Sequence, residues 1–210
     1  MLLFGFGWAR PVPVNSRNFK KFRRDDLLVS IAGVTLNFIL FFFTTLIMVG
    51  LNQLIWKPEM WNLLGMPLLN QKDFLSFNGG NFYSIFTGEN LLFIQESNGY
   101  LSYIPGMFEE YLQTPWLLYV QRFFMNFAMI NLGLCLFNLL PIPPLDGYHV
   151  VNDIFLRGKL HIPAQVMQGL MIALLVIMFA TDFISNLLGN AIYFVQDGVL
   201  SLILGIFGLG

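Results

Sequence analysis

A carboxylate follows a proline-rich break at the end of a long apolar segment. The stretch 137–150 reads FNLLPIPPLDGYHV and places Asp146 directly after three prolines, which interrupt a helix. An acid at membrane depth is costly, and such residues usually serve a function. Non-helical backbone at that depth is tolerated where it is buried in protein or lines a polar cavity. The stretch therefore predicts part of a site inside the bilayer.

Asp146 allows more than one interpretation. It precedes a short helical sequence and could cap that helix. It could also bind zinc, for which an Asp oxygen lies at about 2.0–2.2 Å. The chain has two histidines, His149 and His161, and His149 could share a helix face with Asp146. A catalytic zinc site normally needs three protein ligands, and His161 is expected to be solvated, so we do not expect these residues alone to form one.

Asparagines in two apolar segments lead toward the same region. Asn131 and Asn138 are seven residues apart, so they lie on nearly the same helix face, which leads to Asp146. Arg122 and Asn126 share the opposite face. Asparagines in membrane helices usually hydrogen-bond to a neighbouring helix, so a packing role is the alternative to a site role.

An earlier apolar segment carries a stripe of small and polar residues. The stripe consists of Ser30, Gly33, Asn37 and Thr44. Such a stripe is typical of helix packing in membranes. Asn37 could therefore either pack against another helix or face the site.

The composition is that of an integral membrane protein. The 210 residues are 56% hydrophobic and 11% charged, whereas soluble domains carry about 25% charged residues. A net charge of -1 and the absence of an Arg/Lys tract give no support to nucleic-acid binding. The single Cys135 cannot form an internal disulfide and is expected to be a buried, inert thiol.

Hydropathy predicts one membrane domain, an α-helical polytopic bundle. Helical spans, which need roughly 20 apolar residues, are expected at 27–51, 117–140, 165–183 and 191–207. The last span contains Asp197 and could instead be re-entrant or interfacial. The loop 52–116 mixes Gly/Asn turn signals with apolar residues, which makes short strands or interfacial segments plausible. We favour a variable insertion there over a substrate-screening lid.

The distribution of charge predicts an orientation. Basic residues closely precede the first span: Arg10, Arg17, Lys20, Lys21, Arg23 and Arg24. By the positive-inside rule this N-terminal basic segment is cytoplasmic. The loop 52–116 is mainly acidic and should face outward, whereas Arg157 and Lys159 place the next link in the cytoplasm again. Asp146 is then expected near the cytoplasmic side of a multi-pass integral membrane protein.

The pattern N-x-x-P-x-P-P-x-D-G closely resembles a motif of the site-2 protease family of intramembrane zinc metalloproteases. It matches at Asn138, Pro141, Pro143, Pro144, Asp146 and Gly147. The resemblance implies that Asp146 is the third zinc ligand and that Asn138 helps to position substrate. It also implies that Asn131, the three prolines and Gly147 shape the cleft.

Two earlier segments carry the same resemblance. Residues 32–37 read AGVTLN and resemble the family's A-G-P-x-x-N, with Val34 in place of the proline. The retained Asn37 would help to hold the substrate backbone. Residues 5–19 resemble the family segment that forms membrane-associated strands after the zinc helix. The resemblance thus implies a site-2-protease-like transmembrane bundle with short strands near the N-terminus.

The family's H-E-x-x-H helix has no counterpart in these 210 residues. That helix would supply two His ligands and the general-base Glu, so the chain alone is expected to be inactive, and whether it is an enzyme stays open. We expect the C-terminal part of a site-2-type protease that cleaves membrane-embedded substrates and uses zinc in its complete form. A missing N-terminal segment or a partner chain would supply the zinc helix.

Two alternatives remain. The chain could be a catalytically inactive membrane pseudoprotease or binding protein. It could also be part of a transporter, where broken helices near the midplane are common. The sequence contains no G-x-S-x-G, P-loop or dinucleotide-binding fingerprint.

Overall fold

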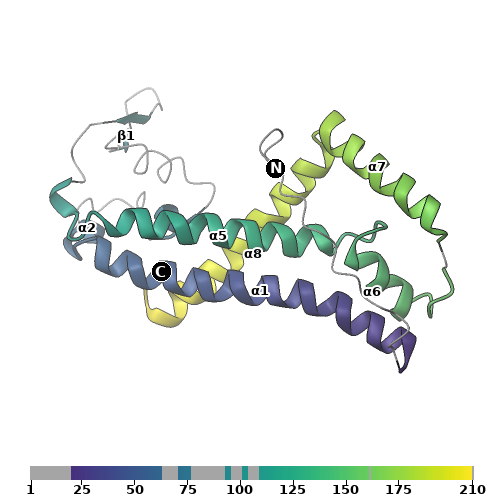
Figure 1. Ribbon diagram of the computed structural model, residues 1–210. Coiled ribbons are helices and arrows are strands. Elements are labelled where there is room, and N and C mark those ends of the chain that lie inside the picture. Colours follow the sequence, from purple (N-terminus) through teal and green to yellow (C-terminus); the bar gives the residue numbers. More distant parts are fainter. Residues whose placement is uncertain are drawn as a thin grey trace.

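In the described residues the fold is a bundle of helices with a small two-stranded antiparallel sheet (Figure 1). The computed structural model describes residues 20–62, 71–76, 93–95, 101–103, 109–160 and 162–209. The helices are α1 (Phe22–Ile55), α2 (Glu59–Asn62), α3 (Gln71–Leu75), α5 (Leu117–Asn138), α6 (Asp146–Ile154), α7 (Ala164–Ala180) and α8 (Phe183–Phe207). A 3-10 turn, η2 (Glu109–Tyr111), precedes α5, and the strands are β1 (Phe93–Gln95) and β2 (Leu101–Tyr103).

Three helices in the described part of the chain are long and apolar enough to cross a membrane. They comprise the 23–55 part of α1, all of α5, and the 184–207 part of α8. At 1.5 Å per residue α1 is about 51 Å long, well beyond the roughly 30 Å hydrocarbon core, so one or both ends must project from it. By the same measure α7 is about 25 Å long and is too short to span upright.

The helix bounds differ from the expected spans mainly near the C-terminus. The predicted segment 27–51 lies inside α1, and 117–140 ends two residues after α5 does. The segment 165–183 corresponds to the shorter α7, and α8 begins well before residue 191. Asp197 does not interrupt α8, because Lys72 of α3 forms an ion pair with it at 2.5 Å.

The core lies where α1, α5 and α8 meet. Figure 1 shows α1 and α5 running side by side, with α8 crossing them obliquely. Buried positions on α1 recur every three or four residues, as a helix packed along one face requires. The buried core side chains come mainly from these three helices and include Phe41, Met48, Val49, Met125, Leu132, Leu200, Ile203 and Leu204.

The two ends of the 52–116 loop are joined to each other. Lys57 N–H donates to the Tyr111 carbonyl at 2.9 Å, and Gln113 N–H donates to the Ile55 carbonyl at 2.8 Å. These bonds place the start of α5 beside the end of α1, which makes the two helices antiparallel. Within the loop β1 and β2 pair antiparallel, with Phe93 opposite Tyr103.

A buried polar cluster fixes α3 to the bundle. Gln121 Nε2 donates to Asn52 Oδ1 at 3.2 Å and to the Met48 carbonyl at 3.4 Å. Asn52 in turn lies 3.5 Å from Gln71 Oε1, and all three amide side chains are buried. Because buried polar groups are costly unless paired, these bonds hold the start of α3 against α1 and α5.

The helical bundle is the predicted architecture. The strands expected near the N-terminus fall on residues 5–19, which lie outside the described residues.

Candidate functional site

Asp146 is the first residue of α6. The helix α5 ends at Asn138, and a non-helical stretch with Pro141, Pro143 and Pro144 leads into α6. Leu145 is the N-cap, and it makes no side-chain capping bond. The interpretation of Asp146 as the N-cap is therefore wrong, and its carboxylate lies in the first turn of α6.

Gly147 allows α6 to approach the end of α5 closely. A Cβ at this position would lie 2.3 Å from the Leu139 carbonyl oxygen and 2.5 Å from the Leu140 carbonyl oxygen. Both contacts are with backbone, which cannot rotate aside as a side chain can. Only glycine fits here, and this close approach fixes where the neighbouring Asp146 lies.

Asp146 faces the middle of α1's first half. A Cβ added to Gly33 would be 3.6 Å from Asp146 Oδ2, so the carboxylate packs against the bare backbone of α1. Asn37 is half-buried and lies one helical turn further along nearly the same face. Leu27, the first residue of the apolar run, lies about 9 Å from Gly33 along the helix axis. Asp146 therefore lies slightly inside one end of the apolar part of α1.

Two further contacts hold α6 along α1. His149 Nδ1 lies 2.9 Å from Asp26 Oδ2, and both side chains are partly exposed. Arg23 donates from Nη2 to the backbone carbonyl of Asp153. Together with the contact at Gly33, these bonds align α6 antiparallel to the first turns of α1. The orientation of Asp146 is thus set from both ends of α6.

Asp153 is a buried acid at the far end of α6. It is 4% exposed, and among the described residues its Oδ2 has no hydrogen-bond partner. Burial raises the pKa of Asp153, Asp26 raises it further, and Arg23 and His149 oppose the rise. Its neighbour Tyr148 donates from the hydroxyl to the Leu160 carbonyl at 2.8 Å, and burial followed by the charge of Asp153 raises the Tyr148 pKa.

A pocket of about 340 Å³ lies between α1, α6 and the start of α7. Its lining includes Arg23, Asp26, His149, Asp153 and Met167. Asp146 is not among the lining residues; it lies on the turn of α6 that precedes His149. The pocket is therefore adjacent to the predicted metal ligand and does not enclose it.

The predicted asparagines occupy different environments. Asn131 is buried, but its Nδ2 donates to the Phe127 carbonyl of its own helix at 2.7 Å rather than to a neighbouring helix. Asn138 is half-buried at the last turn of α5. Asn126 is exposed and donates to the Arg122 carbonyl, on the face away from the bundle. Of these three asparagines of α5, Asn131 and Asn138 share the helix face that leads toward Asp146.

The remaining predicted residues are less enclosed. Pro141 is exposed, whereas Pro143 and Pro144 are half-buried. Ser30 and Thr44 of the small-residue stripe are buried, as a packing face requires. Cys135 is buried in α5, as expected.

The described residues do not complete a zinc site. No group of three or more His, Cys, Asp and Glu side chains comes together in this part of the chain. His149 is occupied by Asp26, and His161 lies outside the described residues. Asp146 could supply one carboxylate oxygen, but the further ligands that zinc needs must come from elsewhere.

Reasoning from sequence missed the roles of Arg23 and Asp26. Arg23 was assigned only to the charged flank of the first span, and Asp26 was given no role, yet each contacts a residue of α6 more than 120 positions away. One signal was present: His149 lies one turn after Asp146, so its partner had to come from whatever helix Asp146 faces.

Comparison with known proteins shows the family of the chain. The sequence model of "Peptidase family M50" matches residues 14–181. A curated protein of Bacillus subtilis (strain 168), named "Putative zinc metalloprotease YwhC", is 30% identical over 209 residues, which are 99% of this chain and 69% of the relative. No solved structure matches the chain significantly. The chain therefore belongs to Peptidase family M50, the site-2 protease family of membrane-embedded zinc metalloproteases.

Proposed function

We propose that this chain provides the Asp-bearing part of a site-2-type intramembrane protease that acts on membrane-embedded protein segments. Asp146 is its zinc ligand, and residues outside this sequence supply the H-E-x-x-H helix. Family membership supports a metalloprotease, and the absence of H-E-x-x-H from the 210 residues supports a divided site. The missing helix belongs either to the same polypeptide or to a partner chain.

The observation that carries this proposal is the packing of Asp146 against Gly33. The carboxylate is directed at the bare backbone of α1, with Oδ2 at 3.6 Å from the added Cβ position. A carboxylate inside the apolar part of a membrane protein is expensive. A metal ion is a partner that would offset this cost.

The neighbouring residues fit substrate positioning. Asn37 on α1 and Asn138 at the end of α5 are both half-buried, so their amides remain partly accessible to a bound peptide. We assign them to holding the substrate backbone. Asn131, the prolines 141, 143 and 144, and Gly147 shape the cleft by fixing how α5 ends and α6 begins.

One observation favours a second candidate function. The described residues bring no three metal-binding side chains together, and the two histidines of the chain do not form the H-E-x-x-H arrangement of the family. A catalytically inactive relative that binds membrane helices without cutting them would have this composition.

We further propose that the basic start of α1 faces the cytoplasm. The cations before α1 and in the link between α6 and α7 lie at the same end of the molecule, which satisfies the positive-inside rule. Arg157→Cys, labelled with a membrane-impermeant maleimide, tests this. The label should react only after the membrane is opened, whereas reaction in intact cells contradicts the orientation. Buried Cys135 contributes little background.

The intact mass of the natively expressed protein, with its N-terminal peptide identified, separates the two functions. A mass well above 24.0 kDa with H-E-x-x-H in the additional sequence supports the protease. Co-purification of a second chain that bears H-E-x-x-H supports it equally. A lone product of 24.0 kDa that begins at Met1 contradicts it and leaves the inactive relative.

A further inference from the structure

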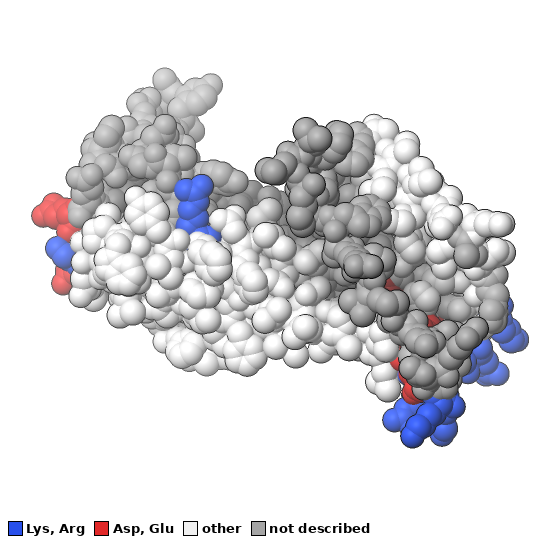
Figure 2. All heavy atoms as spheres, viewed as in Figure 1, with Lys and Arg blue, Asp and Glu red and all other residues white. Residues whose placement is uncertain are grey.

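The end of the molecule where α1 begins is strongly basic on its surface. Figure 2 shows Lys and Arg side chains gathered there, at the lower right. They belong to the start of α1 and to the link between α6 and α7: Lys20, Lys21, Arg23, Arg24, Arg157 and Lys159.

The acids described at this end already have partners or are buried. Asp25 Oδ2 accepts the backbone N–H of Lys20 at 2.8 Å and of Lys21 at 3.1 Å. Asp26 pairs with His149, and Asp153 is buried beneath the surface. None of these carboxylates forms an ion pair with the exposed cations.

Two cations at the start of α1 are unengaged. Among the described residues, no hydrogen bond or ion pair reaches the side chains of Lys21 and Arg24. Arg23 differs, because it donates to Asp153 and its stem packs beside Gly158, where an added Cβ would be 3.2 Å from Arg23 Cγ. The contacts of Arg23 thus hold its side chain against α6, whereas the side chains of Lys21 and Arg24 are available to bind a ligand.

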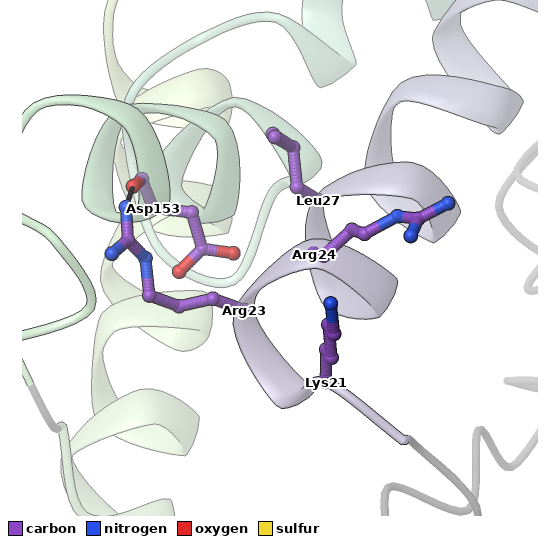
Figure 3. A pocket seen from close by; sticks show the side chains of 5 residues that line it. All are labelled: Lys21, Arg23, Arg24, Leu27 and Asp153. Atoms are coloured by element: carbon purple, nitrogen blue, oxygen red, sulfur yellow. Dashed lines mark hydrogen bonds between the residues drawn. The ribbon is translucent and has the colours of Figure 1, made fainter.

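These side chains line a pocket of about 640 Å³ together with Leu27 and Asp153. Figure 3 shows Arg23 turned toward Asp153 of α6, whereas Arg24 points away from that residue. Leu27 begins the apolar run of α1, and the exposed Leu28 follows it. The pocket therefore lies where the charged and apolar parts of α1 meet, the level at which lipid phosphates meet a spanning helix.

We propose that this pocket binds the phosphate of an anionic phospholipid. Lys21 and Arg24 contact the phosphate, and the acyl chains lie along the exposed apolar side of α1 that begins at Leu28. Basic pockets between transmembrane helices bind lipid head groups in this way. Asp153 also lines the pocket, but it is buried, whereas Lys21 and Arg24 are exposed and present the charge that a phosphate meets. Free phosphate offers nothing to cover the adjacent apolar surface.

The test uses the full chain in a non-ionic detergent, titrated with phosphatidylglycerol. The melting temperature is followed with a maleimide dye that reacts when Cys135, the single and buried thiol, becomes exposed. Phosphatidylglycerol should raise the melting temperature, and phosphatidylcholine should not. The double variant Lys21→Gln/Arg24→Gln should weaken the apparent affinity roughly 25-fold, because each surface cation contributes roughly a factor of five.

A matched variant separates a built site from diffuse attraction. Arg157→Gln/Lys159→Gln removes the same charge at the same end without changing a residue that lines the pocket. Its apparent affinity for phosphatidylglycerol should therefore fall by less than roughly fivefold. An equal loss in both double variants overturns the proposal. Equal stabilisation by phosphatidylcholine overturns it too, and so does equal stabilisation by inorganic phosphate, which would identify a free anion as the ligand.

The salt dependence of the wild-type protein provides a measurement that needs no variant. If Lys21→Gln/Arg24→Gln is not recovered folded, the affinity for phosphatidylglycerol is compared at low and high ionic strength. Binding through exposed cations should weaken as salt rises. An affinity that does not change with salt overturns the proposal.

Discussion

Replacing Gly147 by alanine should displace the start of α6. The new Cβ would lie 2.3 Å from the Leu139 carbonyl oxygen, so the two segments must separate by about 0.7 Å to reach 3.0 Å, below which Cβ contacts essentially do not occur. Overpacking of this kind costs about 1–3 kcal/mol. Alanine's better helix propensity offsets about 0.5–1 kcal/mol of that cost. The net loss is on the order of 1–2 kcal/mol.

The loss should be visible in thermal unfolding. For a chain of this size 1 kcal/mol corresponds to about 2–4 °C, so Gly147→Ala should melt about 2–8 °C below the wild type. The buried thiol of Cys135 reports unfolding through a maleimide dye. Gly189→Ala is the matched control, because an added Cβ there meets nothing within 4 Å. That variant should melt at the wild-type temperature or about 1–4 °C above it.

The reasoning is refuted if Gly147→Ala melts at or above the wild-type temperature while Gly189→Ala behaves as expected. Such a result would mean that α6 does not approach the end of α5 as closely as described, and the location of Asp146 would lose its basis.

Other substitutions test the contacts around the site and the core. Gly33→Ala adds a methyl at an ordinary 3.6 Å from Asp146 and should change stability little, whereas Gly33→Leu should destabilise by about 1–3 kcal/mol; equal effects would contradict the contact. Gln121→Leu leaves Asn52 Oδ1 without its donor and should cost about 1 kcal/mol in thermal unfolding, and no loss would refute the pairing. Asp153 has a folded-state pKa above its ordinary 3.8, so its stabilising contribution is fully present below pH 3.8 and is lost as pH rises through the folded value. Between roughly pH 4 and 8 the melting temperature of Asp153→Asn should therefore depend less on pH than that of the wild type. An equal dependence of the melting temperature on pH in both proteins would contradict this.

Local sequence signals located the main elements of the fold. Apolar runs of sufficient length marked the helices α1 and α5, and Pro141 marked the end of the second. The start of α8 was missed, because the polar residues between 181 and 190 lower the local hydropathy without ending a helix. Asp197 gave the same misleading signal. Its partner Lys72 comes from a loop that hydropathy cannot place in space.

The candidate site could be predicted only in part. The prolines before Asp146 predicted a break between two helices, and the structure has that break between α5 and α6, because chain breaks are visible in a linear sequence. The contacts that orient this turn join α6 to α1 across more than 120 residues. Such pairings depend on how helices pack, so Asp26 carried no signal of its own, and Gly33 was interpreted only as a packing residue.

Zinc content per chain tests the central claim most directly. The protein is purified from its native membranes, and bound zinc is measured in the wild type, in Asp146→Asn and in Asp182→Asn, an exposed acid at the start of α8. We predict about one zinc per chain in the wild type and in Asp182→Asn. Asp146→Asn should lose the metal. A wild type without zinc, or an Asp146→Asn protein that retains it fully, would contradict the assignment of Asp146 as a zinc ligand.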